Sequence, residues 1–331
     1  QLSDPYYYKS LPATIAPDTG PMVASIAEQL HQTGFISSKQ KQYLKEPTTP
    51  RARYFYTLPK IHKDPATWPL PHKTPMGRPI VSDCSSETYN TAEFLTHYLT
   101  PLSTKHPSYL KNTYHFVDIV RNLQVHPQDL LFSLDVSSLY TNIDIEQGLK
   151  SIERAFRENP DSNRPDTLLL ELLRINLCRN DFVFDEKYYL QVKGTAMGKR
   201  FAPAYANIYM AHWEEEALNK CKLRPSQYYR YLDDIWGIWP HSKQEFEVFV
   251  NTLNSVHPSI QVSGSAEDYS IDFLDTTVYK GLDFERFGLL DVRVFFKKTD
   301  SHALLHKDSH HPKHSFAGLV KSQLLRFPKL V

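Results

Sequence analysis

The segment YYRYLDDIWGIW, residues 228–239, decides the fold that the sequence predicts. Its aromatic and β-branched residues are typical of strands, and the acidic pair Asp233 and Asp234 falls where a tight turn would join two of them. An isolated aspartate pair usually forms such a turn and nothing more. A third aspartate changes this interpretation, because Asp135 stands near the end of DLLFSLDV, residues 129–136, whose mostly apolar character predicts a buried strand.

These carboxylates point to metal chemistry. A carboxylate pressed against a buried strand costs free energy unless a cation compensates it, and adjacent aspartates repel each other. Two divalent ions about 3.5–4 Å apart, bridged by carboxylates from different strands, would offset both costs. Mg²⁺ fits best because it prefers oxygen ligands and needs few protein ones when phosphates supply the rest. The sequence therefore predicts a site for two Mg²⁺ ions, with Mn²⁺ as the alternative metal.

The composition is that of a globular chain with unevenly distributed charge. The 331 residues include 38 Lys and Arg against 37 Asp and Glu, and 41% are hydrophobic, which excludes disorder, a coiled coil and a small disulfide scaffold. No stretch approaches the roughly 20 apolar residues of a membrane helix. The three cysteines lie far apart, which predicts reduced thiols in an intracellular protein. Basic residues gather between positions 39 and 78 and again after 296, a distribution that suits a polyanionic partner.

Hydrophobic periodicity predicts helices and strands mixed along the chain, and hence an α+β fold. Helices are expected around residues 20–34, 91–102, 112–123, 145–158, 166–177, 202–218 and 243–256. Single strands are expected at 53–61, 78–83, 129–136, 259–263, 271–279 and 289–296, a hairpin at 182–192 and a strand pair at 228–239.

Five motifs, in this order, resemble those of reverse transcriptases. They are TLPKIHK at 57–63, GRPIVSDCSSETY at 77–89, FSLDVSSLYTNI at 132–143, GTAMGKRFAPAYANIYM at 194–210 and YLDD at 231–234. The residues of these motifs, together with the histidine-rich stretch 299–327, are similar to those of the Penelope-like retroelement reverse transcriptases, which are relatives of telomerase. The resemblance covers nearly the whole chain and implies an RNA-directed DNA polymerase.

The resemblance also implies a domain plan and partners. The fold would be the fingers and palm of a right-hand polymerase, an antiparallel palm sheet with flanking helices, and a missing or incomplete thumb. Residues 1–46 would lead into the fingers, 47–130 form the fingers, 131–297 form the palm with a finger insertion at about 145–195, and 298–331 form a basic connection toward the thumb. The implied partners are an RNA template, a DNA primer and dNTPs, with no membrane. The implied location is the nucleus, and relatives are normally fused to a thumb and often to a GIY-YIG endonuclease domain.

The palm residues receive roles from this resemblance. Asp135 and Asp233 would hold the two metal ions, with the backbone carbonyl of Val136 as an extra ligand and Asp234 as a supporting carboxylate. Tyr140 falls where the family places its sugar gate, a ring that excludes the ribose 2′-hydroxyl and so favours deoxynucleotides. A tyrosine packed in the palm core is the alternative interpretation.

The finger residues receive roles in the same way. Lys60 and Arg78 would reach the triphosphate of the incoming nucleotide, although surface or template-backbone charge is an alternative. Gly198 would let the backbone approach the nucleotide and the template base closely. Lys199 and Arg200, which follow it, would add charge that grips template phosphates.

A third group concerns the primer end of the palm. Phe273, Leu274 and Asp275, with a partner strand at 291–296, resemble the hairpin that supports the primer. Their apolar alternation is equally typical of plain core strands.

Two alternatives concern the tail and the function. His302, His306, His310, His311 and His314 are interpreted as a loop that contacts phosphates or packs beneath the thumb, with a zinc site as the alternative. A non-catalytic nucleic-acid-binding remnant and an RNA-dependent RNA polymerase are the rival functions, and Tyr140 argues against the second.

Overall fold

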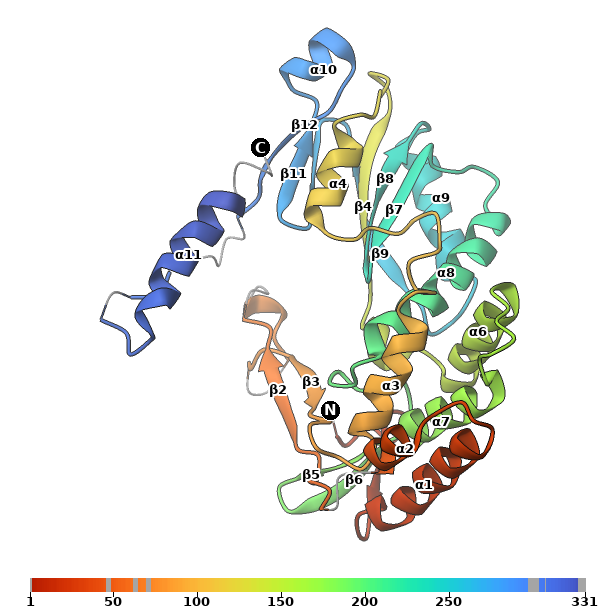
Figure 1. Ribbon diagram of the computed structural model, residues 1–331. Helices are drawn as coiled ribbons and strands as arrows, with labels where there is room; N and C mark the ends of the chain where they lie inside the picture. Colours follow the sequence, from red (N-terminus) through yellow and green to blue (C-terminus); the bar gives the residue numbers. More distant parts are fainter. Residues whose placement is uncertain are drawn as a thin grey trace. The chain divides into compact units, whose positions relative to one another are not determined.

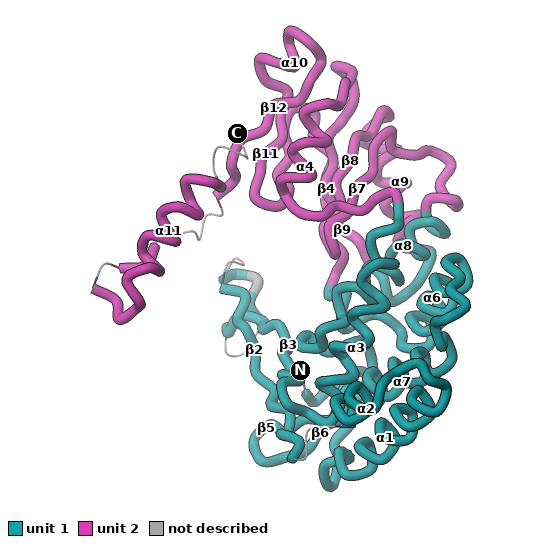
Figure 2. Tube along the Cα trace, viewed as in Figure 1, with its two compact units in different colours: residues 1–106, 138–217, 256–260 teal, residues 107–137, 218–255, 261–331 magenta. Residues whose placement is uncertain are grey.

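The computed structural model describes residues 2–45, 49–61, 65–69, 73–296, 304–306 and 308–326. The chain divides into two compact units, each assembled from segments distant in sequence (Figure 2). Unit 1 comprises Gln1–His106, Ser138–Ala217 and Val256–Ile260, and unit 2 comprises Pro107–Ser137, Leu218–Ser255 and Gln261–Val331. Among the described residues, no helix combines the length and apolar character needed to cross a bilayer.

Unit 2 is built on a four-stranded antiparallel sheet of order β7-β8-β4-β9. Its strands are β4 (Leu130–Val136), β7 (Gln227–Tyr231), β8 (Asp234–Trp239) and β9 (Val262–Glu267). A second antiparallel sheet joins β10 (Ser270–Phe273), β11 (Thr276–Tyr279) and β12 (Asp291–Val294). The helices of the unit are α4 (Thr113–Val120), α9 (Lys243–Asn254), α10 (Leu282–Phe287) and α11 (Lys313–Arg326).

Helices cover both faces of the larger sheet, which explains the continuous apolar run of β8. On one face, the Phe116 ring of α4 lies 5.1 Å from Trp236 and 4.7 Å from Phe273, measured between ring centroids. On the other face, Phe249 of α9 lies 4.9 Å from Trp239 (Figure 1). Successive residues of a strand point to opposite faces, so a strand buried on both sides loses the usual polar alternation.

Unit 1 contains two small sheets and most of the helices. One sheet has the order β1-β6-β5, and the other pairs β2 with β3. Their strands are β1 (Tyr8–Leu11), β2 (Phe55–Pro59), β3 (Gly77–Val81), β5 (Asp181–Phe184) and β6 (Lys187–Gln191). The helices are α1 (Ala16–Gln32), α2 (Ser38–Lys45), the 3₁₀ turn η1 (Pro65–Thr67), α3 (Tyr89–Leu99), α5 (Leu139–Asn142), α6 (Ile145–Glu158), α7 (Asp166–Cys178) and α8 (Ala202–Lys220), whose last turn belongs to unit 2.

Local signals in the sequence account for these helices. The α6 helix begins after Asp144, whose side chain accepts the N–H of Gln147 at 3.0 Å and satisfies one of the free donors of the first turn. Leu149, Ile152 and Phe156 then recur on one buried face. The α9 helix begins with a capping box formed by Ser242 and Glu245.

The α+β class predicted from the sequence is confirmed, and the predicted helices are all present within a few residues of their expected ends. Two strand predictions are wrong. Residues 271–279 form two strands, because Leu274 adopts a left-handed φ of 54° and turns the chain. The strand expected at 259–263 begins instead at Val262, after a turn closed by the Ile260 N–H and the His257 carbonyl. The boundaries of fingers and palm stay predictions.

Candidate active site

Pairing of β4 with β8 brings the acidic motifs together. In this register Asp135 lies directly opposite Asp234. Opposite residues of an antiparallel pair project from the same face, with Cβ atoms about 4.5–5.5 Å apart. Asp233 occupies the adjoining turn, and its carbonyl accepts the Val136 N–H at 2.9 Å. Residues a hundred positions apart in sequence therefore meet at one end of the unit 2 sheet.

A buried arginine stabilises the turn that contains Asp233. Leu232 has φ 54°, a left-handed conformation that costs a non-glycine residue about 1 kcal/mol. Arg230 is buried, and its Nη1 donates to the Leu232 carbonyl at 3.0 Å. Its backbone also bonds to the segment before α4, through Ser108 and Leu110. Sequence analysis missed Arg230, although a charged residue inside an aromatic strand is a signal that could have revealed it.

The three carboxylates face outward rather than inward. Asp135 is exposed, and Asp233 and Asp234 are half-buried. Their neighbours Leu134 and Ile235 are almost fully buried and fill the core. The expectation that the carboxylates themselves are pressed into the apolar strand is therefore wrong, because alternation turns Leu134 inward and Asp135 outward. The acidic side chains are accessible to a dissolved ion or a phosphate.

The oxygen atoms at this end of the sheet are of the chemical type that Mg²⁺ prefers as ligands. Asp135, Asp233 and the carbonyl of Val136 offer oxygen ligands, and Mg²⁺ is typically held by one or two carboxylates plus substrate phosphates and water. No group of three or more His, Cys, Asp and Glu residues that could hold a metal occurs in the described part of the chain. This result covers Asp135, Asp233 and Asp234 as well as His306, His310, His311 and His314, whereas His302 lies outside the described residues. Metal binding therefore stays a prediction.

Two predicted finger cations share one face of the β2–β3 hairpin in unit 1. Arg78 lies opposite Leu58, and the Lys60 N–H donates to the Met76 carbonyl at 2.9 Å. Lys60 and Leu58 are two residues apart, so the side chains of Lys60 and Arg78 fall on the same face as diagonal neighbours. Arg78 is exposed and Lys60 is half-buried. The hairpin thus presents a pair of cations, as an anionic ligand would require.

Tyr140 and Gly198 belong to two tightly packed pieces of unit 1. Tyr140 lies in the short helix α5, is half-buried, and accepts the Thr195 N–H through its carbonyl at 2.7 Å. At Gly198 a Cβ atom would lie 2.1 Å from the carbonyl oxygen of Val81. Close approach of β3 is therefore sufficient reason for this glycine. The sugar gate and the nucleotide contact stay predictions.

The prediction that Lys199 grips template phosphates is wrong. This side chain is buried and its Nζ lies 2.8 Å from Asp83 Oδ1. Burial lowers the pKa of Lys199 to about 8, even though the charge of Asp83 favours the protonated form. Arg200 is exposed, but it donates to Glu93 at 2.9 Å and to the Tyr89 hydroxyl at 2.6 Å.

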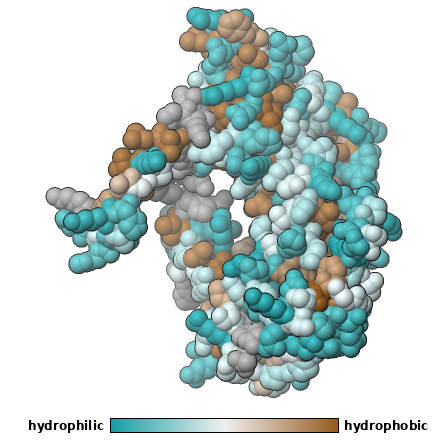
Figure 3. All heavy atoms as spheres, viewed as in Figure 1, coloured by the Kyte–Doolittle hydropathy of each residue, from teal (hydrophilic) through white to brown (hydrophobic). Residues whose placement is uncertain are grey.

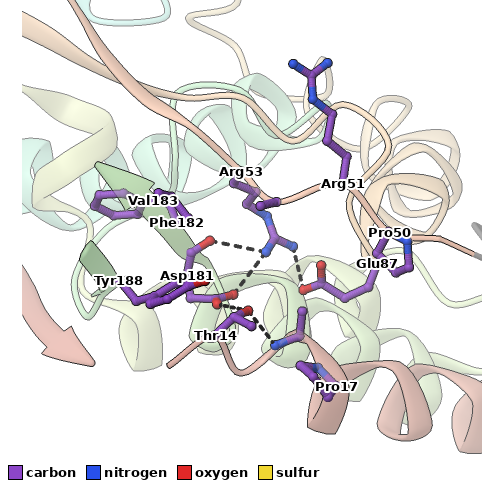
Figure 4. A pocket seen from close by; sticks show the side chains of 12 residues that line it. Thr14, Pro17, Pro50, Arg51, Arg53, Glu87, Asp181, Phe182, Val183 and Tyr188 are labelled. Atoms are coloured by element: carbon purple, nitrogen blue, oxygen red, sulfur yellow. Dashed lines mark hydrogen bonds and ion pairs between the residues drawn. The ribbon is translucent and has the colours of Figure 1, made fainter. Parts of the chain in front are cut away.

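Lys199 belongs to a buried ion cluster that sequence analysis missed. The guanidinium of Arg53 lies 2.9 Å from Asp83, 2.8 Å from Glu87 and 3.3 Å from Asp181. Burial alone would raise the pKa of Asp83, but the charges of Lys199 and Arg53 hold it below its ordinary value. Figure 4 shows the Arg53 guanidinium between Asp181 and Glu87 in the wall of a cavity of about 270 Å³. The charges of this cluster compensate one another, although Asp83 Oδ2 is buried without a hydrogen-bond partner.

The predicted primer hairpin is a turn on the core of unit 2. Phe273 is buried and its ring packs on Phe116, so this side chain serves the core. Leu274 and Asp275 form the turn between β10 and β11, and the Asp275 carbonyl accepts the Phe295 N–H at 2.9 Å. A contact with a primer would have to come from the turn, and it stays a prediction.

No protein-family model matches the sequence, and no curated protein matches it. Solved structures do resemble the fold. A truncated apo telomerase from Candida tropicalis is 11% identical with a TM-score of 0.53, over 76% of this chain and 56% of that one. A Candida albicans telomerase in complex with a telomeric RNA fragment is 13% identical with a TM-score of 0.51, over 74% of this chain and 47% of that one. The RNA-dependent RNA polymerase of a human picobirnavirus is 11% identical with a TM-score of 0.51, over 73% of this chain and 46% of that one.

The chain thus spans about half the length of the solved structures it matches. At these identities the likeness is one of fold. The fold, with its mixed helices and antiparallel sheets, resembles that of these telomerases and of the RNA polymerase.

Proposed function

We propose that this chain is the fingers and palm of an RNA-directed DNA polymerase from a Penelope-like retroelement. The observation that supports this most is the pairing of Asp135 with Asp234, with Asp233 in the adjoining turn, on a fold shared with polymerases. Acidic residues from two strands that meet at an exposed sheet end supply carboxylates of the kind that two-metal nucleotidyl transfer uses.

Each side chain then has a definite task. Two Mg²⁺ ions held by Asp135, Asp233 and the Val136 carbonyl would lower the pKa of the primer 3′-hydroxyl and offset charge on the transferred and leaving phosphates. Asp234 orients this acidic end from the strand opposite Asp135. Lys60 and Arg78 bind the triphosphate, since cationic donors suit phosphate oxygens.

The partners follow from the same proposal. The Candida albicans telomerase resembling this chain was solved with telomeric RNA. By analogy the polymer bound here is an RNA template paired with a DNA primer, and dNTPs are the substrates. A nuclear location, a thumb and a fused GIY-YIG endonuclease domain are parts of the proposal that rest on the family resemblance alone.

The likeness to a picobirnavirus polymerase favours a second candidate, an RNA-dependent RNA polymerase. The two candidates differ in the sugar they accept. A tyrosine ring at the sugar gate excludes the ribose 2′-hydroxyl, so Tyr140 favours the first. A non-catalytic remnant that only binds nucleic acid is the third candidate.

Primer extension by the full chain separates the three. An RNA template annealed to a DNA primer is incubated with Mg²⁺ and either dNTPs or NTPs. We expect extension with dNTPs only, and we expect Tyr140→Val to increase NTP incorporation relative to dNTP incorporation, whereas Tyr269→Val leaves the ratio unchanged. Extension with NTPs alone would favour the RNA polymerase, and template binding without extension would favour the remnant.

A further inference from the structure

An aromatic and cationic surface lies near the start of the chain in unit 1. It is separate from the β2–β3 hairpin and from the Arg53 cluster. The ring of Tyr6 is 59% exposed and meets Tyr7 edge to face at 4.9 Å between centroids. The Nζ atom of Lys193 lies 3.8 Å from the Tyr6 centroid and 5.7 Å from the Tyr7 centroid, and it bonds to the Tyr6 hydroxyl. Tyr6, Tyr7 and Lys193 are called the tyrosine ledge below.

Hydrogen bonds on either side of Tyr6 and Tyr7 position the backbone of the ledge. Tyr8, the next residue, is buried and pairs with Gln191 of β6, while the Val192 N–H donates to the Tyr7 carbonyl at 2.9 Å. The Tyr6 N–H donates to the carboxylate of Asp4 at 3.0 Å. These bonds hold the backbone of the two tyrosines beside the segment that carries Lys193, which limits the conformational freedom that is lost when a ligand binds.

The ledge also adjoins the motif that carries the predicted sugar gate. The Tyr7 hydroxyl donates to Asn142 Oδ1 at 2.9 Å, and Asn142 ends helix α5, two residues after Tyr140. Gly194, the residue after Lys193, packs against the backbone of Tyr140 and Thr141 so closely that a Cβ would lie 2.4 Å from the Tyr140 carbonyl oxygen. The ledge and the α5 helix therefore form one surface within unit 1.

Charge on this surface favours an anion. Lys193 supplies one cation, and Lys9, which is exposed on β1, follows Tyr7 by two residues in the sequence. Asp4, at the base of the ledge, is the acidic residue that touches it, through the Tyr6 N–H. Exposed aromatic rings beside cations are the arrangement by which proteins bind single-stranded nucleic acids, since bases stack on rings and phosphates approach cations.

We propose that the tyrosine ledge binds one unpaired nucleotide of a single-stranded nucleic acid, with the base stacked on Tyr6 and the phosphate near Lys193. The assignment of that strand as the polymerase template rests on the proposed function. A template base held here would be presented beside the α5 helix before it pairs.

Binding of fluorescent 12-nucleotide RNA and DNA of the same sequence to the full chain tests this proposal by anisotropy. We expect Tyr6→Ala to weaken binding about tenfold and Tyr6→Phe to retain it, since stacking needs the ring and not the hydroxyl. Tyr269→Ala is the matched control, because Tyr269 is 60% exposed and lies in unit 2. We expect Lys193→Gln to lower the slope of log Kd against log salt by about 0.7, the value for one phosphate of a single strand.

The outcomes separate the two proposals. Loss of affinity for RNA alone identifies the template strand, and loss for DNA alone identifies a DNA strand; each supports the ledge. Binding by Tyr6→Ala within twofold of Tyr269→Ala overturns the ledge, and wild-type primer extension in that case leaves the polymerase function standing. A wild-type chain that binds single strands through Tyr6 but extends no primer keeps the ledge and contradicts the polymerase.

Discussion

Two acidic clusters of this chain lie in contrasting environments. In unit 1, Asp83, Glu87 and Asp181 are buried and each lies within 3.3 Å of the Arg53 guanidinium. In unit 2, Asp135 is exposed and Asp233 and Asp234 are half-buried at the end of a sheet. Carboxylates that the chain neutralises with its own buried cations need no cation from solution. Carboxylates at an exposed strand end can bind a cation from solution, which is the difference between a structural cluster and a candidate active site.

Substitutions in the buried cluster of unit 1 should reduce the free energy of unfolding more than substitutions in the exposed cluster of unit 2. Replacing a whole buried ion pair by apolar residues is often neutral, but removing one partner leaves an uncompensated buried charge. Substitution at an exposed polar position usually changes stability by less than about 0.5 kcal/mol. Stability measurements on variants of each cluster can therefore test this contrast.

The largest effect is expected for Arg53→Met, which leaves three buried carboxylates without their common cation. We expect a loss of about 3–5 kcal/mol in the free energy of unfolding, measured by urea denaturation. Arg51→Met is the control, because Arg51 is exposed and its side chain points away from the cluster (Figure 4). Equal stability of the two variants would show that the Arg53 cluster does not support the fold.

A smaller, pH-dependent effect is expected for Asp83→Asn. Hydrogen bonds to charged groups contribute about 1.5–3 kcal/mol, so we expect a loss of about 2 kcal/mol at pH 7. Because Lys199 and Arg53 lower the folded-state pKa of Asp83, its stabilising contribution is present above the unfolded carboxyl value and is lost as pH falls through the folded value. The difference between wild type and variant should therefore shrink as pH falls below the unfolded carboxyl value of about 4.

Asp118→Asn is the control for this dependence, since Asp118 is an exposed residue of helix α4. Its difference from wild type should stay small at every pH. A gap between wild type and Asp83→Asn that does not change on acidification would contradict the assignment of a lowered pKa to Asp83.

The fold was predictable where local patterns and a recognised motif agreed. Two turns, at Leu232 and Leu274, show where this prediction succeeded and where it failed. Leu232 and Leu274 both have φ 54°, and each is followed by an aspartate. The first turn was predicted because two aspartates interrupt an aromatic strand pair. The second was missed because neither glycine nor asparagine marks it, and only the packing of β11 against β12 shows why the chain reverses there.

The site was predictable in part for a similar reason. The acidic motifs lie at strand ends, and strand pairing brings such ends together. The Arg53 cluster was not predictable, since Arg53 and Asp181 lie far apart in sequence and no local pattern marks them as partners. Lys199 follows a glycine loop that resembles a nucleotide contact, and only tertiary burial shows that it pairs with Asp83.

Apolar exposure was equally hard to anticipate from the sequence. On the visible face, apolar side chains gather over helix α11, where Val320, Leu324 and Leu325 are exposed (Figure 3). Sequence analysis predicted no helix at these positions, so this exposed apolar face was not anticipated.

The smallest stability effect is expected for Asp135→Asn. Because this side chain is exposed, we expect the free energy of unfolding to change by less than about 0.5 kcal/mol in the same urea experiment. A loss as large as that of Arg53→Met would mean that Asp135 belongs to a structural cluster, and the contrast between the two clusters would fail.

The central claim, that Asp135 and Asp233 form a catalytic centre, is tested most directly by primer extension with folded Asp135→Asn and Asp233→Asn chains beside the Asp118→Asn control. Metal-assisted charge stabilisation is worth several kcal/mol, so we predict a loss of at least about 100-fold in the dNTP extension rate for the first two variants and none for the control. Extension at the wild-type rate by either variant would contradict the claim.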